Sequence, residues 1–202
     1  MSQATEPRFV ESRRIGEATV TAISEGTGYL TIIKALTVPE ELWRQEVEAN
    51  DEGEVLLGFN VCHVRTSDAS ILIDTGFDEP SLASPWMPPK YQRSPGVEAG
   101  LATIGVRPEE VTHVLFTHAH GDHIAGATVE RAGRSVPRYR NAAYVIGRAD
   151  WEGNPARQQP GSLVAVHLGA LAERLAYLSP FASSEVEKRI STSLDTSGVP
   201  WL

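Results

Sequence analysis

The stretch that decides the fold is VLFTHAHGDHIAG, residues 114–126. Three histidines and one aspartate fall within its six positions from His118 to His123, and the whole chain has six histidines. Half of the histidines therefore lie in one short segment, directly after an apolar run. Such a cluster points to a metal site.

The spacing of these four side chains suits metal coordination. His118 and His120 are separated by one residue, so both imidazoles can point to the same side of an extended segment. Gly121 permits a sharp turn, and Asp122 and His123 follow at the predicted start of a helix. Imidazole together with carboxylate suits zinc, and also iron or manganese. Two pairs can also hold two ions, one on His118 and His120, the other on Asp122 and His123.

The alternative interpretation is a chance cluster of surface histidines in which Asp122 serves as a helix N-cap. An N-cap requires one aspartate, and it does not require three flanking histidines at the edge of an apolar strand. The sequence therefore favours the metal site.

Strands and helices alternate around this motif. Strands are predicted where β-branched and apolar residues gather, at 18–26, 54–64, 70–76, 111–116 and 142–147. Helices are predicted where apolar residues recur at helical spacing or follow a proline start, at 38–50, 97–105 and 162–178. The alternation predicts an α/β layered sandwich, with residues 1–202 in a single domain.

A proline-rich stretch, residues 77–96, predicts an irregular loop long enough to be functional. Two interpretations of its large side chains stay open: they line a pocket for an apolar substrate, or they pack as a surface loop. The side chains are Phe77, Trp86, Met87 and Tyr91.

The motif and its context resemble the metallo-β-lactamase-fold hydrolases. THAHGDH (117–123) is similar to the HxHxDH signature of that family, and ILIDTGF (71–77) to its strand and turn that carry a buried aspartate. GVRPEEVTHVLFTHAHGDHIAG (105–126) is similar to its helix end, strand and metal loop. The resemblance covers residues 15–150. It implies a metallo-β-lactamase-like αββα sandwich, of which this chain would hold the N-terminal half and the following helix.

By this resemblance His118 and His120 would be ligands of a first metal, and Asp122 and His123 ligands of a second. Asp122 would also handle protons, as the catalytic residue. Asp74 would hold the metal loop by hydrogen bonds. From the residues alone, Asp74 ends an apolar strand before a glycine, so capping that turn is its other possible role.

Within the family, the chain looks most similar to the lactonase and organophosphate-hydrolase branch. That implies a metallo-hydrolase with one or two zinc ions, in which a metal-bound hydroxide attacks a lactone, ester or related small molecule. The alternative is a catalytically impaired metal-binding or interaction protein, derived from such a hydrolase by loss of its second half.

The ligands that this family supplies after the motif are not evident here. A third histidine normally follows in a GHTPGH-like turn, with a bridging aspartate and a final histidine later. After His123 the chain has only His167, which we interpret as a packed or surface helix residue. Asp195 has no ligand context, His113 is interpreted as packing in the sheet or supporting the site, and His63 as a strand residue.

The domain is therefore expected to be incomplete at its C-terminus, or to complete its site as a homo-oligomer. Half a sandwich would also leave the apolar face of its sheet uncovered, where a partner would be needed.

Composition excludes several other functions. With 18 Lys and Arg against 26 Asp and Glu, the net charge is −8, which argues against nucleic acid as a partner. Cys62 is the one cysteine, so no intramolecular disulfide forms, and we interpret it as a small apolar residue on a strand. No apolar run approaches a signal peptide or membrane span. We expect a cytoplasmic protein that acts on a small-molecule substrate, with no membrane partner.

Overall fold

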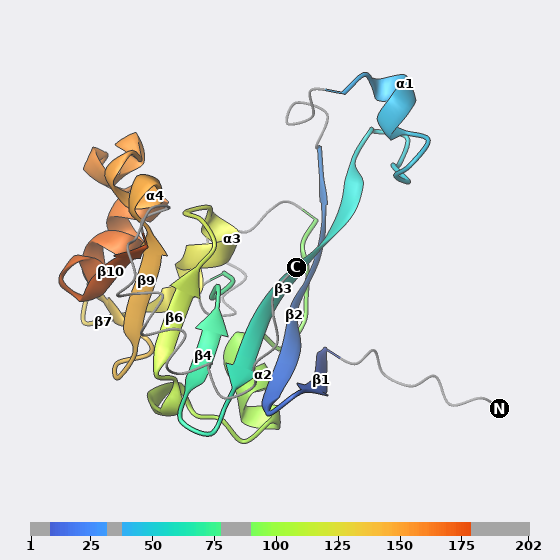
Figure 1. The fold of residues 1–202 in the computed structure, drawn as a ribbon. Helices are drawn as coiled ribbons and strands as arrows, with labels where there is room; N and C mark the ends of the chain where they lie inside the picture. Colours follow the sequence, from blue (N-terminus) through green and yellow to red (C-terminus); the bar gives the residue numbers. More distant parts are fainter. Residues whose placement is uncertain (1–8, 32–37, 78–89, 179–202) are drawn as a thin grey trace.

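The structure, a computed structural model, describes residues 9–31, 38–77 and 90–178. Its strands form a mixed eight-stranded sheet in the order β1-β2-β3-β4-β6-β9-β10, with β5 paired to β2, and β7 and β8 form a separate hairpin (Figure 1). The strands are Val10–Ile15 (β1), Ala18–Leu30 (β2), Val55–Arg65 (β3), Ser70–Ile73 (β4), Gln92–Arg93 (β5), His113–Phe116 (β6), Thr128–Arg131 (β7), Arg134–Pro137 (β8), Ala143–Gly147 (β9) and Leu175–Leu178 (β10).

Short helices connect these strands. The α-helices are Glu40–Trp43 (α1), Val97–Thr103 (α2), Gly121–Ile124 (α3) and Arg148–Glu152 (α4). Turns of 3-10 helix cover Pro108–Glu110 (η1), Ala125–Ala127 (η2), Pro155–Gln158 (η3) and Gly169–Arg174 (η5), and Val164–Leu168 (η4) is a π-helix.

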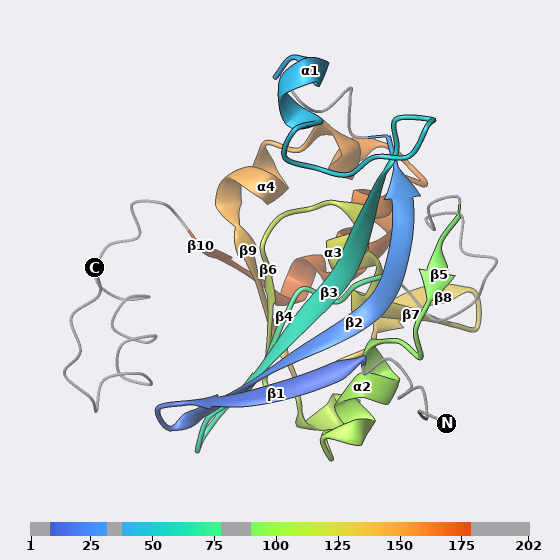
Figure 2. The same cartoon turned by 90° about the vertical axis from the view of Figure 1, so that its right-hand side faces the viewer.

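The sheet combines an antiparallel half with a parallel half. β1 to β4 pair antiparallel in chain order, and β2 and β3 extend beyond the other strands as a long hairpin with α1 near its tip (Figures 1 and 2). β4, β6, β9 and β10 run parallel to one another. Because parallel strands end at the same edge of a sheet, the turn after β4 and the turn after β6 meet there. This edge carries the 118–123 segment.

One face of the sheet forms the core. Leu72 and Val114 at its centre are fully buried, and α2 covers this face below β2, where it inserts the buried Leu101 (Figure 2). The helix predicted at 97–105 is confirmed as Val97–Thr103. The strand predicted at 111–116 forms at His113–Phe116, but it is buried on one face only, since Leu115 on the other face is half-buried.

The opposite face of the sheet is apolar but only half-buried. Cross-strand pairing places Cys62, Ile73, Leu115 and Val145 in one row across β3, β4, β6 and β9. All four have intermediate exposure. Among the described residues, such a half-buried apolar row agrees with the expectation that half a sandwich leaves one apolar face of its sheet uncovered.

The helix predicted at 38–50 is wrong beyond its first turn. α1 stops at Trp43, and Ala49 instead forms a β-bridge with Val55. The side chain of Asn50 accepts hydrogen bonds from the backbone N–H groups of Glu52 and Glu54, at 3.0 and 2.8 Å. A short helix is marginal in water, so this local turn and the bridge outweigh the helical pattern.

The helix predicted at 162–178 is also wrong at its end. Buried Val164, Leu168 and Leu171 do pack into the core from a helical segment, but that segment is a π-turn followed by a 3-10 turn. Leu175–Leu178 form β10, parallel to Tyr144–Gly147 of β9. The leucine spacing is compatible with both structures, and strand pairing at the edge of the sheet decides between them.

Two histidines outside the 118–123 segment are buried in this framework. His63, 1% exposed on β3, shares a 2.8 Å hydrogen bond with Ser70 Oγ, and burial lowers its pKa to about 4. His167, 5% exposed in η4, shares a 2.8 Å hydrogen bond with Thr128 Oγ1, and burial lowers its pKa to about 4 as well.

These histidines predict a loss of stability in mild acid. A histidine in the unfolded chain titrates near 6.5, so between pH 6.5 and 4 the unfolded state binds protons that the folded state excludes. The contribution of each of these two neutral histidines to stability is therefore fully present above pH 6.5 and falls as the pH drops, by roughly 2–3 kcal/mol per histidine at pH 4.5. Urea unfolding of His63→Gln at pH 7.5 and 4.5 should show a shallower loss than the wild type. His113→Gln, at an exposed position, should leave the loss unchanged.

Candidate metal centre

The predicted metal ligands lie at the carboxyl end of β6. The strand ends at Phe116, Thr117 follows, and His120 is the last extended residue before α3 begins at Gly121 (Figure 1). Asp122 and His123 therefore lie in the first turn of α3, as the sequence predicted. Gly121 does not adopt a positive φ, so the turn itself does not require glycine; a Cβ there would come within 2.7 Å of Leu163 Cδ1, a side-chain methyl group that would have to shift.

Asp74 holds this segment through three hydrogen bonds. Its Oδ1 accepts from the backbone N–H of Thr117 at 2.8 Å, and its Oδ2 accepts from Thr117 Oγ1 at 2.8 Å. Oδ2 also lies 2.8 Å from Nδ1 of His123. Asp74 is 6% exposed and adopts φ of +60°, a conformation that costs a non-glycine residue energy. The predicted support of the loop by Asp74 is thereby confirmed.

The turn that carries Asp74 is joined to α3 by the main chain. The backbone N–H and the hydroxyl of Thr75 both donate to the carbonyl oxygen of His123, each at 2.8 Å. Gly126 N–H donates to the carbonyl of Gly76 at 3.0 Å. A Cβ on Gly126 would lie 2.1 Å from the carbonyl oxygen of Thr75, so only glycine permits this approach. The two turns therefore form one rigid unit.

Asp122 and His123 present two donor atoms at ligand spacing. His123 Nε2 and Asp122 Oδ2 are 3.3 Å apart. Two ligand atoms each about 2.0–2.1 Å from a tetrahedral ion are separated by about 3.3–3.4 Å. Because Nδ1 of His123 is held by Asp74, Nε2 is the nitrogen left for an ion.

The two carboxylates also set the charge of His123. Hydrogen bonds to Asp122 and then to Asp74 raise the pKa of His123 to about 9. Burial raises the pKa of Asp122, but its hydrogen bond to His123 and the charge of His123 outweigh this effect, so the net pKa is lowered. Without an ion, a proton therefore occupies the place between these two side chains.

The three histidine rings of the motif lie together. The centroid of the His118 ring is 3.9 Å from that of His123 and 4.4 Å from that of His120. Burial, followed by the charges of His123 and His120, lowers the pKa of His118. A neutral imidazole is the form that binds a metal ion.

The donor atoms of the motif are of the kind that bind a divalent ion, but the structure brings them to ligand spacing two at a time. Among the residues that the structure describes, no group of three or more His, Cys, Asp and Glu is arranged to hold a metal ion. The four motif residues supply imidazole and carboxylate donors close together.

The remaining histidines make hydrogen bonds with residues outside the motif. His167 is a buried residue bonded to Thr128, which confirms its interpretation as a packed histidine. The interpretation of His113 as a packing or supporting residue is wrong: it is exposed at the start of β6, the opposite end of the strand from the motif, and shares a hydrogen bond with Thr112. Asp195 lies outside the described residues.

Sequence reasoning missed Thr117. Its hydroxyl lies 3.1 Å from Nδ1 of His118 and 3.2 Å from Nδ1 of His123, in addition to its bond to Asp74. The only signal in the sequence was its position as a polar residue between an apolar strand and the first histidine.

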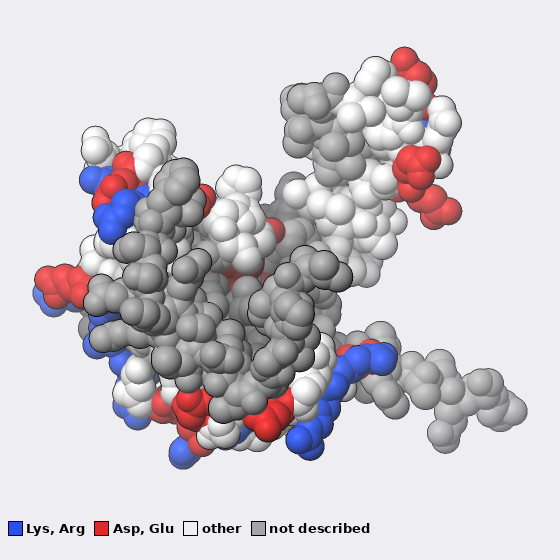
Figure 3. All heavy atoms as spheres, in the orientation of Figure 1, with Lys and Arg blue, Asp and Glu red and all other residues white. Residues whose placement is uncertain are grey.

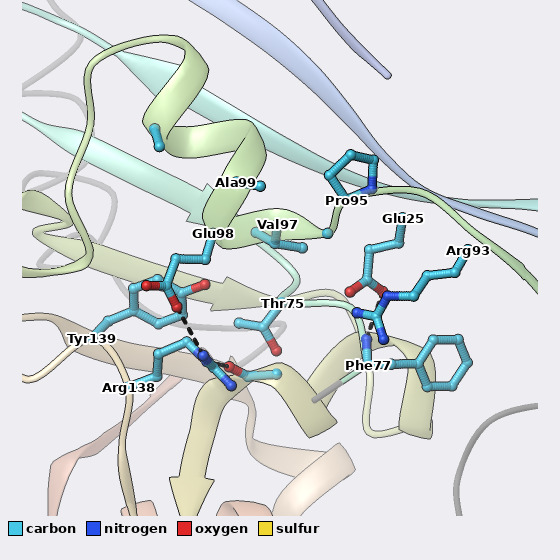
Figure 4. Close-up of a pocket in the computed structure, with 13 residues that line it drawn as sticks. Glu25, Thr75, Phe77, Arg93, Pro95, Val97, Glu98, Ala99, Arg138 and Tyr139 are labelled. Carbon is cyan, nitrogen blue, oxygen red and sulfur yellow. Dashed lines mark hydrogen bonds and ion pairs between the residues drawn. The ribbon is translucent and has the colours of Figure 1, made fainter. Parts of the chain in front are cut away.

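A separate cavity of about 410 Å³ is lined in part by Thr75 and Phe77, which follow Asp74 in the chain (Figure 4). Glu25, Thr75, Phe77, Arg93, Arg138 and Tyr139 are among its lining residues. No residue of the 118–123 segment is among them, so this cavity is distinct from the cluster. Phe77 also packs edge-to-face with Phe59 and Tyr91, at ring distances of 5.2 and 5.5 Å. Trp86 and Met87 lie outside the described residues.

The surface charge is mixed. On the face in Figure 3, basic and acidic side chains alternate along the rim, and the described residues there form no continuous basic stripe. None of the helices in the described ranges combines the length and hydropathy that crossing a bilayer takes.

Comparison with known families gives one match along most of the chain. Residues 40–200 match the family model described as the metallo-beta-lactamase superfamily. A curated relative, a UPF0173 metal-dependent hydrolase from Mesorhizobium japonicum, is 32% identical over 96 residues, which is 45% of this chain and 33% of the relative.

Solved structures share the fold. A probable metal-dependent hydrolase from Staphylococcus aureus superposes with a TM-score of 0.67 at 22% identity, over 83% of this chain and 61% of that one. AidC, a dizinc quorum-quenching lactonase, gives 0.63 at 16% identity, over 88% and 63%. AbOPH, a hydrolase in the beta-lactamase superfamily, gives 0.62 at 21% identity, over 90% and 64%. The chain thus spans about three-fifths of each solved structure and a third of the curated relative.

Proposed function

This chain belongs to the metallo-beta-lactamase superfamily, and on that premise we propose that it acts as a metal-dependent hydrolase at the carboxyl edge of its parallel strands. The ligands would come from the four motif residues, His118 and His120 for one ion and Asp122 and His123 for a second. The observation that carries the proposal is the 3.3 Å spacing of His123 Nε2 and Asp122 Oδ2, with His123 fixed from behind by Asp74.

The proposed metal is zinc, as one or two ions. Mixed imidazole and carboxylate ligands suit zinc, although iron and manganese accept the same donors. The dizinc lactonase of the same fold supports zinc by analogy. A bound zinc ion supplies a hydroxide nucleophile at neutral pH, because it lowers the pKa of water to about 7.

The proposed substrates are lactones, esters or related small molecules. The support is the fold shared with a lactonase and with other hydrolases, together with a sheet edge that places its polar groups at the surface. Asp122 is the proposed proton-handling residue, because its carboxylate lies at the ion site and its lowered pKa keeps it ionised at neutral pH. Asp74 would orient His123 and would not touch the substrate.

The second candidate is a metal-binding protein without turnover. One observation favours it: no three donors converge among the described residues. Such a protein would bind zinc weakly through the Asp122–His123 pair and would not hydrolyse esters.

Removal of the metal separates the two candidates. We expect the purified chain to contain zinc and to hydrolyse lactone or ester substrates. A chelator such as EDTA should abolish this activity, and added Zn²⁺ should restore it, because the nucleophile depends on the ion. Metal content is measured by elemental analysis and hydrolysis by pH-stat titration. Zinc uptake with no hydrolysis would support the second candidate, and a chain that takes up no zinc would contradict both.

A further inference from the structure

Thr117 lies at the point where the supporting network meets the cluster of histidines. Its Oγ1 is 2.8 Å from Asp74 Oδ2 and 3.1 Å from His118 Nδ1. Its side chain is hydrogen-bonded to both Asp74 and His118, whereas His123 is hydrogen-bonded to Asp74 and meets His118 through a ring contact. The same oxygen is 3.2 Å from Nδ1 of His123.

The protons of this network can be assigned by counting. A threonine hydroxyl has one hydrogen, and an ionised carboxylate can only accept. Hydrogen bonds to a carboxylate are the stronger ones, so the hydroxyl hydrogen goes to Asp74 Oδ2. The hydroxyl oxygen then has only lone pairs to offer to His118, and a hydrogen bond at 3.1 Å requires the proton to be on Nδ1 of His118.

The hydrogen bond between Nδ1 of His118 and Thr117 leaves Nε2 of His118 as the nitrogen that can bind a metal ion. Nδ1 and Nε2 lie on different edges of the imidazole ring, so a ring whose Nδ1 faces Thr117 turns Nε2 away from it. His123 follows the same pattern, because its Nδ1 faces Asp74 while its Nε2 lies beside Asp122. The two histidines therefore present the same ring nitrogen on the side away from the Asp74–Thr117 pair.

We propose that Thr117 is a positioning residue that fixes the tautomer of His118, so that Nδ1 carries the proton and Nε2 is the metal-binding atom. The inference rests on the proposed metal site and adds to it the residue that selects the ligand atom. In metal sites generally, the partner of the second ring nitrogen sets which nitrogen binds. Here that partner is the Thr117 hydroxyl, which donates its own hydrogen bond to Asp74.

Thr117 is exposed, so its substitution is not expected to unfold the chain. Thr117→Val removes the hydroxyl at nearly constant shape, and Thr117→Ser restores it. Thr103→Val is the matched control: Thr103 is exposed on α2, and its hydroxyl donates to the Ala99 carbonyl, away from the motif.

The first readout is the tautomer itself, measured without metal. Long-range ¹H–¹⁵N spectra of the metal-free full chain at pH 8 distinguish the two nitrogens, and the His118 signals are assigned by their loss in His118→Gln. We expect His118 to be protonated on Nδ1 in the wild type, Thr117→Ser and Thr103→Val, and to shift towards the Nε2-protonated form in Thr117→Val. An Nε2-protonated wild type, or no shift in Thr117→Val, would overturn the proposal.

The second readout is zinc affinity, measured by competition with a chromophoric chelator. Thr117→Val should weaken binding by about 10- to 100-fold, as loss of an outer hydrogen-bond partner does, while Thr117→Ser stays near the wild type. Equal affinity of Thr117→Val and the wild type overturns the inference even if the chain hydrolyses esters. The expected tautomer and zinc results without any hydrolysis would instead support the inference and contradict the proposed function.

Discussion

Replacing His118 by alanine is expected to reduce hydrolysis by at least about a hundredfold, because loss of a ligand should exceed the 10- to 100-fold cost of losing an outer partner. His118 follows the rigid end of β6, and its ring lies within 4.4 Å of those of His120 and His123. Removing it takes one imidazole donor from the cluster. Zinc content per chain and the initial rate of ester hydrolysis are the measurements.

The control for this variant is His113→Ala, five residues earlier. His113 is of the same residue type and begins the same strand, but it is exposed at the opposite end of β6. Its loss should leave zinc content and rate near the wild type. Equal activity of the wild type and His118→Ala would contradict the assignment of the metal site, provided that both fold with similar melting temperatures.

The second large effect is expected for Asp74→Ala, which should destabilise the fold by roughly 3–5 kcal/mol. The substitution leaves the backbone N–H and hydroxyl of Thr117 and Nδ1 of His123 without their acceptor. A loss of this size is a substantial share of the stability of a typical domain. Zinc affinity should also fall by about 10- to 100-fold, because His123 is no longer oriented.

Two further variants isolate the role of Asp74. Asp74→Asn keeps the shape and one acceptor oxygen, so it should retain more stability than Asp74→Ala but still bind zinc weakly. Asp51→Ala removes an exposed carboxylate from a surface turn and should change neither property. Urea unfolding and zinc titration measure the two effects separately. An Asp74→Ala chain as stable as Asp51→Ala would show that the three hydrogen bonds contribute little.

Local pattern was sufficient for several elements. The apolar run at 111–116 forms β6, and the runs at 54–64 and 70–76 form the paired strands β3 and β4. The four-residue spacing of Val97 and Leu101, together with Gly105 at the predicted end, gave a correct prediction for the helix α2. In each case the order of apolar and polar residues within one segment matches the burial pattern of the element, so a short stretch of sequence is sufficient to predict it.

Local pattern failed where a distant strand decided the outcome. Leu175 and Leu178 fit a helical stripe, yet they form β10 because Tyr144–Gly147 offers a free parallel edge. The helix predicted at 38–50 ends early because Ala49 pairs with Val55. Neither pairing can be deduced from the periodicity of the segment itself, since tertiary contacts override weak local preferences.

The sequence by itself determined which donor groups are present for the proposed chemistry: the identity and spacing of His118, His120, Asp122 and His123, and their place after the strand β6. Only the tertiary structure decided which atoms are available for that chemistry. Asp74 lies 43 residues from Thr117 and 49 residues from His123, and the three meet because β4 and β6 run parallel and end at the same edge. Neighbouring residues in the sequence can supply the candidate ligands, whereas the hydrogen bonds that orient those ligands depend on how the strands pair.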